Sequence, residues 1–150
     1  MQLKIVTVLA FLLLFAPMAI AQDAITDDDL KRYAISMDSI ENMKAGFIQR
    51  ITEMVNSNEN ISAARYNDLS KIISDEVKLA EAEATPEEIE FVNLVAQKKE
   101  EETAKINATF QSLAVDYIGA KTYNAIKTAL KNDEAVKQRY EVILKEVQTD

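Results

Sequence analysis

The sequence predicts an all-α protein: an antiparallel bundle or hairpin of two long helices, at about 27–55 and 86–118, one medium helix at about 62–83, and two short C-terminal helices. Three observations lead to this fold class. Apolar residues recur every three or four positions, which is the period of one helix face. No segment alternates apolar and polar residues for long enough to predict a strand. After residue 21 the chain holds one proline and two glycines, far fewer than loops usually require.

The first 21 residues are predicted to be a secretory signal peptide that is removed after Ala21. One positive charge, Lys4, precedes an almost unbroken apolar run at 5–15, and Ala19-Ile20-Ala21 is a small-x-small cleavage site. An uncleaved anchor is the alternative, but the apolar stretch is at the short limit for spanning a bilayer. We therefore expect an exported protein, periplasmic or secreted, with a single helical domain at 22–150 and no stable membrane span.

The first long helix is expected to begin after Thr26, whose hydroxyl can accept a backbone N–H. The three aspartates at 27–29 place negative charge at the positive end of the helix dipole. Ile25 and Leu30 have the spacing of a hydrophobic staple. An apolar face then runs to the polar segment at 56–60 and consists of Leu30, Tyr33, Met37, Ile40, Lys44, Phe47, Ile51 and Met54, with Ile48 and Val55 beside it.

The medium helix is expected to begin at Ser62. Its predicted apolar face consists of Tyr66, Leu69, Ile73, Val77 and Ala80, with Ile72 beside it. The segment that follows, Thr85-Pro86-Glu87-Glu88, is the strongest local signal in the chain. Thr85 is the expected N-cap, Pro86 suits the first helical position, and Glu88 completes a capping box.

The second long helix carries nine positions at a spacing of three and four residues. They are Ile89, Val92, Ala96, Lys99, Thr103, Ile106, Phe110, Leu113 and Tyr117. Gly119 is expected to end this helix in a left-handed conformation. Two short amphipathic helices follow, separated by Asn132-Asp133; the first presents Tyr123, Ile126 and Leu130, and the second presents Val136, Tyr140, Ile143 and Val147.

Three polar residues, Lys44, Lys99 and Thr103, interrupt the two long apolar faces. We favour the interpretation that the lysines extend into water from an exposed part of the seam. The alternative is that they set the register or leave a polar groove. The five tyrosines all fall on apolar faces and are expected at the edge of the core.

Two segments resemble a known family. They are Leu30-Lys31-Arg32-Tyr33-Ala34 near the start, and Tyr123-Asn124-Ala125-Ile126 followed by Asn132-Asp133-Glu134-Ala135-Val136-Lys137-Gln138-Arg139 near the end. They are similar to the exported bacterial family catalogued as domain of unknown function 4168, whose members have a signal peptide, an aromatic-Ala pair in the first helix and a tail of the form Y-x-x-I…N-D-P-E-L…R. This chain lacks the proline after the Asn-Asp pair, and the similarity does not cover 56–105. The resemblance implies a helical fold and an envelope or secreted location, but no activity and no functional residues.

The composition restricts the chemistry that this chain can perform. There is no cysteine and no histidine, which excludes disulfides, thiolate nucleophiles, His-based zinc sites and the Ser-His-Asp triad. Between Glu76 and Glu102 lie nine acids and three bases. These carboxylates could hold a calcium ion, but they lack the spacing of a calcium loop, so we expect a solvated surface. We predict no catalytic, cofactor-binding or metal-binding residues and no cofactor. Asn60 and Asn107 match the glycosylation sequon, and we interpret both as chance matches.

The formal net charge of −8 argues against nucleic acid and anionic membranes as partners. Our leading hypothesis is an exported, non-enzymatic helical protein of the envelope or secretome that acts through contacts with a protein partner or a second copy. The alternative is a periplasmic chaperone-like protein that holds unfolded clients, using Met37, Met43 and Met54. A carboxylate-based cation binder or an enzyme is the third and weakest hypothesis. We predict no small-molecule ligand.

Overall fold

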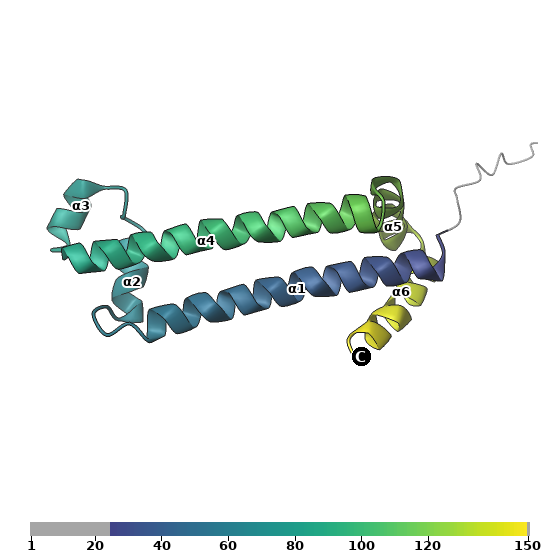
Figure 1. The fold of residues 1–150 in the computed structure, drawn as a ribbon, viewed down its shortest axis with the longest axis horizontal. Helices are drawn as coiled ribbons and strands as arrows, with labels where there is room; N and C mark the ends of the chain where they lie inside the picture. Colours follow the sequence, from purple (N-terminus) through teal and green to yellow (C-terminus); the bar gives the residue numbers. More distant parts are fainter. Residues whose placement is uncertain (1–24, 150) are drawn as a thin grey trace, which may run out of the picture.

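The computed structural model describes residues 25–149, so the predicted signal peptide at 1–21 lies outside the described residues. Two long helices, α1 (Asp27–Asn56) and α4 (Pro86–Ser112), run antiparallel along the length of the molecule (Figure 1). At one end α2 (Ala63–Ser70) and α3 (Glu76–Glu81) connect them. At the other end lie α5 (Ala120–Asn132) and α6 (Glu134–Val147). The described chain contains no strand, and the predicted all-α hairpin is confirmed.

Both long helices begin with the predicted caps. The Asp29 N–H donates to the Thr26 hydroxyl at 3.1 Å, and the Thr26 N–H donates to the Asp29 carboxylate at 3.0 Å. Thr85 and Glu88 make the same reciprocal pair, at 3.2 and 3.0 Å. Two backbone donors that the helix leaves open are thereby satisfied at each start.

The segment predicted as one medium helix is helical, but it divides into α2 and α3 at a turn over 71–75. Asp75 accepts the Lys78 N–H at 3.1 Å and so caps a new helix. The new start changes which side chains face the core. Leu79 is buried, whereas Val77, which we expected on the apolar face, is 68% exposed. The prediction of one continuous face through this segment is therefore wrong.

The second long helix ends where predicted, but through an irregular last turn. A π-helical turn, η1 (Leu113–Tyr117), follows α4, and the Ile118 N–H donates to the Leu113 carbonyl at 3.0 Å. Gly119 then stops the helix with φ 92° and ψ 128°. The positive φ was expected, but this ψ lies outside the left-handed helical region that we predicted.

The buried apolar residues form two separate clusters, one at each end of the hairpin. The cluster at the α2–α3 end, which we call the head, contains Val55, Ile61, Tyr66, Leu69, Leu79, Val92 and Val95. The cluster at the α5–α6 end, which we call the base, contains Leu30, Tyr33, Ile118, Ile126 and Val136. Each end is therefore a small core of its own on a shared pair of helices.

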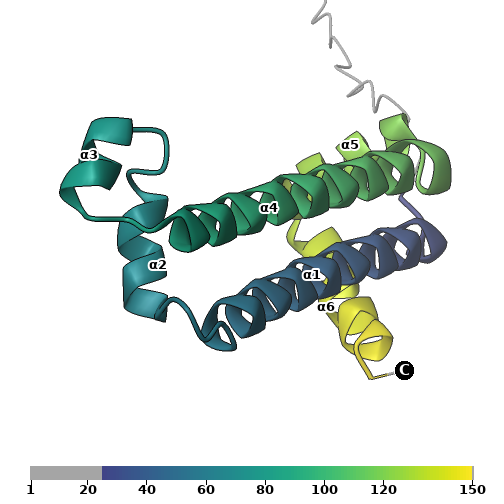
Figure 2. The ribbon, with the colours of Figure 1, turned by 60° about the vertical axis from the view of Figure 1, so that its left-hand side comes forward.

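One arginine at each end fastens the shorter helices to the long pair. In the head, Arg65 donates to both oxygens of Glu88, at 2.8 and 2.9 Å, and to the Ala82 carbonyl at 2.9 Å. In the base, Arg139 of α6 donates through Nε to Asp27 at 2.9 Å and through Nη2 to the Ile25 carbonyl at 3.0 Å. The tail helices are thus docked on the start of α1, as Figures 1 and 2 show.

Between the two clusters lies a section that we call the waist, residues 41–53 of α1 and 96–105 of α4. Every side chain of α4 from 96 to 105 is exposed except Glu102. Lys44, Lys99 and Thr103 lie here and are exposed, in line with the interpretation that we favoured for the two lysines. The Lys99 ammonium also donates to the Tyr66 hydroxyl at 2.8 Å. The predicted seam is therefore well packed at its ends and open at its centre.

Candidate functional site

A groove of about 530 Å³ opens where α1, α4, α5 and α6 meet, at the boundary between the base and the waist. We call it the tyrosine groove. Its apolar lining comes from α1, α4 and α5 and consists of Met37, Ile40, Ile106, Phe110 and Leu130. Five polar side chains complete the lining: Tyr33, Glu41, Lys44, Asn107 and Tyr140. This combination of an apolar floor and a few polar groups is typical of a binding site.

Packed aromatic rings hold one wall of the groove. Tyr33 contacts Tyr140 edge-on, with ring centroids 5.7 Å apart and an interplanar angle of 73°. On its other side it lies 5.5 Å from the ring of Tyr123, which in turn meets Phe110 edge-on at 5.7 Å. Tilted and edge-on contacts of this kind favour one arrangement of the rings, so the wall is preorganised. Four helices contribute these rings, because α1, α4, α5 and α6 each supply one of them.

Tyr123 and Tyr140 lie at the edge of the core, as predicted, whereas Tyr33 and Tyr66 are buried within it and Tyr117 lies outside it. Tyr117 belongs to the π-helical turn and is 43% exposed. The wider turn takes this residue away from the face on which the regular spacing had placed it.

The polar side chains of the tyrosine groove are available to a ligand. Within residues 25–149, none of the five donates or accepts a side-chain hydrogen bond or forms an ion pair. The arginines that fasten the head and the base are, in contrast, already paired with carboxylates. A partner that enters the groove would therefore find two phenol hydroxyls, one carboxylate, one ammonium and one carboxamide without competitors from the described chain.

Burial further disfavours ionisation of the two groove tyrosines, whose phenols are neutral at ordinary pH in any case. Removal from water raises the pKa of Tyr140 to about 12, and the nearby Tyr33, Glu41 and Asp38 add to the effect. Burial also raises the pKa of Tyr33, with a smaller contribution from Tyr123. A phenol of raised pKa acts as a hydrogen-bond donor and acceptor rather than as a nucleophile. The groove is thus suited to recognition.

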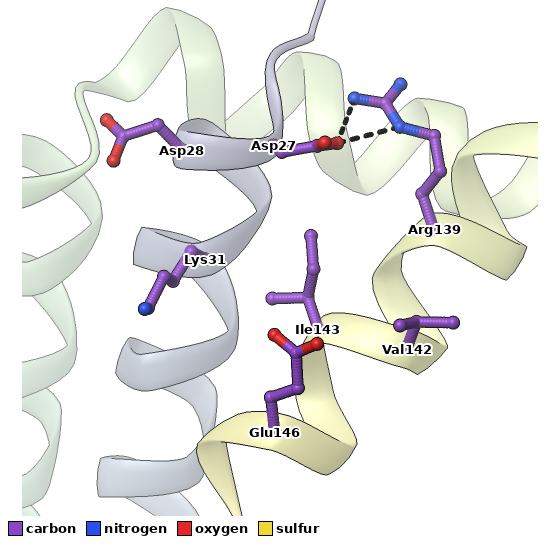
Figure 3. A pocket seen from close by; sticks show the side chains of 7 residues that line it. All are labelled: Asp27, Asp28, Lys31, Arg139, Val142, Ile143 and Glu146. Carbon is purple, nitrogen blue, oxygen red and sulfur yellow. Dashed lines mark hydrogen bonds and ion pairs between the residues drawn. The ribbon is translucent and has the colours of Figure 1, made fainter.

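A second groove, of about 500 Å³, lies between the start of α1 and α6 (Figure 3). It is lined by Asp27, Asp28, Lys31, Arg139, Val142, Ile143 and Glu146. Figure 3 shows Arg139 reaching over to Asp27, and Asp28 pairs with Arg32 at 3.2 Å. The Asp27–Arg139 pair holds α6 on α1, and we therefore assign this groove a structural role.

The acidic segment between Glu76 and Glu102 is distributed along the surface. Glu88 binds Arg65, Glu101 binds Lys98 at 2.7 Å, and Glu102 binds Arg50 at 2.7 Å. Within residues 25–149, no three acidic side chains gather in a way that could hold a metal ion. None of the helices in this range has the length and apolar character needed to cross a membrane.

The tyrosine groove was not identified from the sequence, although several of its residues were singled out for other reasons. Lys44 was noted as an interruption of the seam, Asn107 as part of a sequon, and Tyr33 and Tyr140 as core-edge residues. For Lys44, our alternative interpretation was that the residue leaves a polar groove, and this interpretation pointed to the site of the tyrosine groove. Asn60, the other sequon asparagine, is exposed in the connection between α1 and α2.

A scan against protein-family models, a search of curated proteins and a search of solved structures each found no match. The resemblance of the first helix and the tail to an exported bacterial family therefore stays a prediction.

Proposed function

We propose that this protein is an exported, non-enzymatic helical protein of the bacterial envelope or secretome that binds a protein partner in the tyrosine groove. The observation that supports the proposal is the groove's preformed apolar floor, bordered by five polar side chains with unused hydrogen-bonding capacity. An amphipathic helix laid into an apolar groove is a recurrent mode of recognition, with apolar anchors spaced by one helical turn. The resemblance of the tail to an exported family agrees with this location.

The chemistry of the lining residues favours binding over catalysis. A general acid or base works best when its pKa lies near the working pH. Burial moves the pKa of Tyr140 in the opposite direction, to about 12, and that of Tyr33 upward as well. The two tyrosines can therefore orient a partner through neutral hydroxyls, which supports a role in recognition.

The test fills the groove without disturbing the core. Asn107 and Asn93 are both exposed on α4, but only Asn107 lines the groove. Wild type, Asn107→Trp and the matched control Asn93→Trp serve as baits in an envelope extract and in culture fluid of the source organism. We expect one dominant partner to bind wild type and the control and to be lost with Asn107→Trp. If all three baits retain the same partner, or none retains any, the proposal is wrong.

A second candidate function is that of a chaperone-like holder of unfolded clients. It is favoured by Met37 in the floor of the groove, because methionine adapts to many apolar shapes. The measurement is the aggregation of a model client with equimolar protein, followed by light scattering. Slower aggregation with wild type and Asn93→Trp, but not with Asn107→Trp, would support it. No effect of the wild type would eliminate it.

A further inference from the structure

The waist leaves an apolar strip of α1 only partly covered by described residues. Ile48 is 64% exposed, and Phe47 and Ile51 are only half-buried, although all three belong to the apolar side of α1. Most helical stability in proteins comes from packing of an apolar face rather than from helix propensity. Because no third layer lies over this strip, α1 presents an apolar surface that another helix could cover.

Charge indicates what covers the strip. The waist contains five acids and five bases, so it is neutral, whereas the head at 54–95 contains nine acids and three bases. The base, residues 25–40 and 106–149, contains nine acids and eight bases. An acidic chain repels its own copies wherever acidic surfaces meet. The neutral waist is therefore a stretch where two copies can touch without that repulsion, whereas two heads cannot.

We propose that a second copy of this chain docks on the waist, antiparallel to the first, so that the two α1 helices pack against each other around Phe47, Ile48 and Ile51. In this orientation each acidic head lies beside the nearly neutral base of the other copy. A parallel arrangement would instead place two heads of net charge −6 side by side. The charge distribution therefore selects the antiparallel dimer, which has the isologous two-fold symmetry that most homodimers have.

The two-fold axis of this dimer passes close to Ile48. The last buried residue of α1 before the waist is Ile40, and the first one after it is Val55. The midpoint between these two residues, which is the centre of the strip, falls between Phe47 and Ile48. In an antiparallel pair of α1 helices, the residue at the centre meets the same residue of the other copy. From Ile40 to Val55 the strip is about 22 Å long, which makes a small interface, so we expect the dimer to be reversible.

The test uses the absence of cysteine from the chain. The variants Ile48→Cys and Val77→Cys each carry a single cysteine, so any disulfide must join two molecules. The two positions are matched, because the original side chains are 64% and 68% exposed. We expect mild oxidation to link Ile48→Cys into a disulfide-bonded dimer and to form no disulfide in Val77→Cys, whose cysteine lies in the head. Sedimentation of the purified wild type should show a reversible dimer, which Ile48→Glu abolishes and Val77→Glu preserves.

Other outcomes would overturn the inference. A wild type that stays monomeric up to about 1 mM would show that no second copy covers the strip and would leave it to a helix of another protein. Disulfide formation by Val77→Cys as fast as by Ile48→Cys would exclude the antiparallel orientation. The inference does not rest on the tyrosine groove: partner capture is tested by Asn107→Trp and dimerisation by Ile48→Glu, so the two proposals can fail separately.

Discussion

The separation of the head from the base can be tested with one leucine pair. Leu69 is fully buried in the head, where it packs with Tyr66 and Leu79. Leu69→Ala removes its buried methyl groups and leaves a cavity, so we expect the free energy of unfolding to fall by about 2–5 kcal/mol. Leu94→Ala is the matched control, because Leu94 is also helical but is 42% exposed. The control should change the free energy of unfolding by about 0.5 kcal/mol or less.

The location of the loss is more informative than its size. The buried residues of the head and the base form two clusters, and the waist between them has an open seam. A cavity in the head should therefore loosen the head alone. Hydrogen exchange of Leu69→Ala is expected to show faster exchange in α2, α3 and the adjoining ends of α1 and α4. Amides of α5 and α6 should keep their wild-type protection.

Urea unfolding measures the total cost, and hydrogen exchange assigns it to a region. Equal costs for Leu69→Ala and Leu94→Ala would mean that the burial of Leu69 does not carry the stability that we assign to it. A uniform loss of protection that includes α5 and α6 would refute the separation itself. The long helices would then couple head and base into one cooperative unit despite the open waist.

Three further predictions concern single groups. Because burial raises the pKa of Tyr140 to about 12, the free energy of unfolding should decline as the pH rises from about 10 to 12. Thermal melts over this range should show a smaller decline of the melting temperature in Tyr140→Phe than in wild type. The hydrogen bonds from Arg65 lower the pKa of the Glu88 carboxyl. The ionised carboxylate therefore stabilises the fold at neutral pH, and this stabilisation is lost as the pH falls through the lowered pKa. The variant Glu88→Gln should melt at a lower temperature than wild type near pH 7, and the difference in melting temperature should shrink in acid. Gly119→Ala should lower the free energy of unfolding by about 1–3 kcal/mol, because φ 92° is strained for alanine. Gly46→Ala, in the interior of α1, should leave the free energy of unfolding unchanged or raise it by up to about 1 kcal/mol. Opposite or equal effects of the two substitutions in urea unfolding would contradict this assignment.

Features that depend on neighbours in the sequence were predicted well. The starts of both long helices were predicted at Thr26 and Thr85, because a cap needs only a side chain and a backbone N–H two or three residues away. Gly119 was predicted to end the second long helix for a similar local reason. The apolar faces of the two tail helices were also correct, since Ile126 and Val136 are buried.

Features that depend on packing between distant segments were predicted less well. The spacing of three and four residues continued through Val77 and Tyr117, yet both are exposed. A cap at Asp75 and a π-helical turn at 113–117 change the phase of the helix, and neither leaves a strong pattern in the sequence. The tyrosine groove was missed because its lining comes from four helices that only the fold brings together.

The amino-acid sequence by itself determined the helices, their caps and the hairpin formed by the two longest, because helix periodicity and capping act over a few residues. It also determined the absence of thiol and imidazole chemistry, since the chain has neither residue. Only the tertiary structure decided which parts of the predicted seam are buried. Burial requires a third element over the helix pair; α2 and α3 supply it at the head and α5 and α6 at the base, whereas the waist stays open.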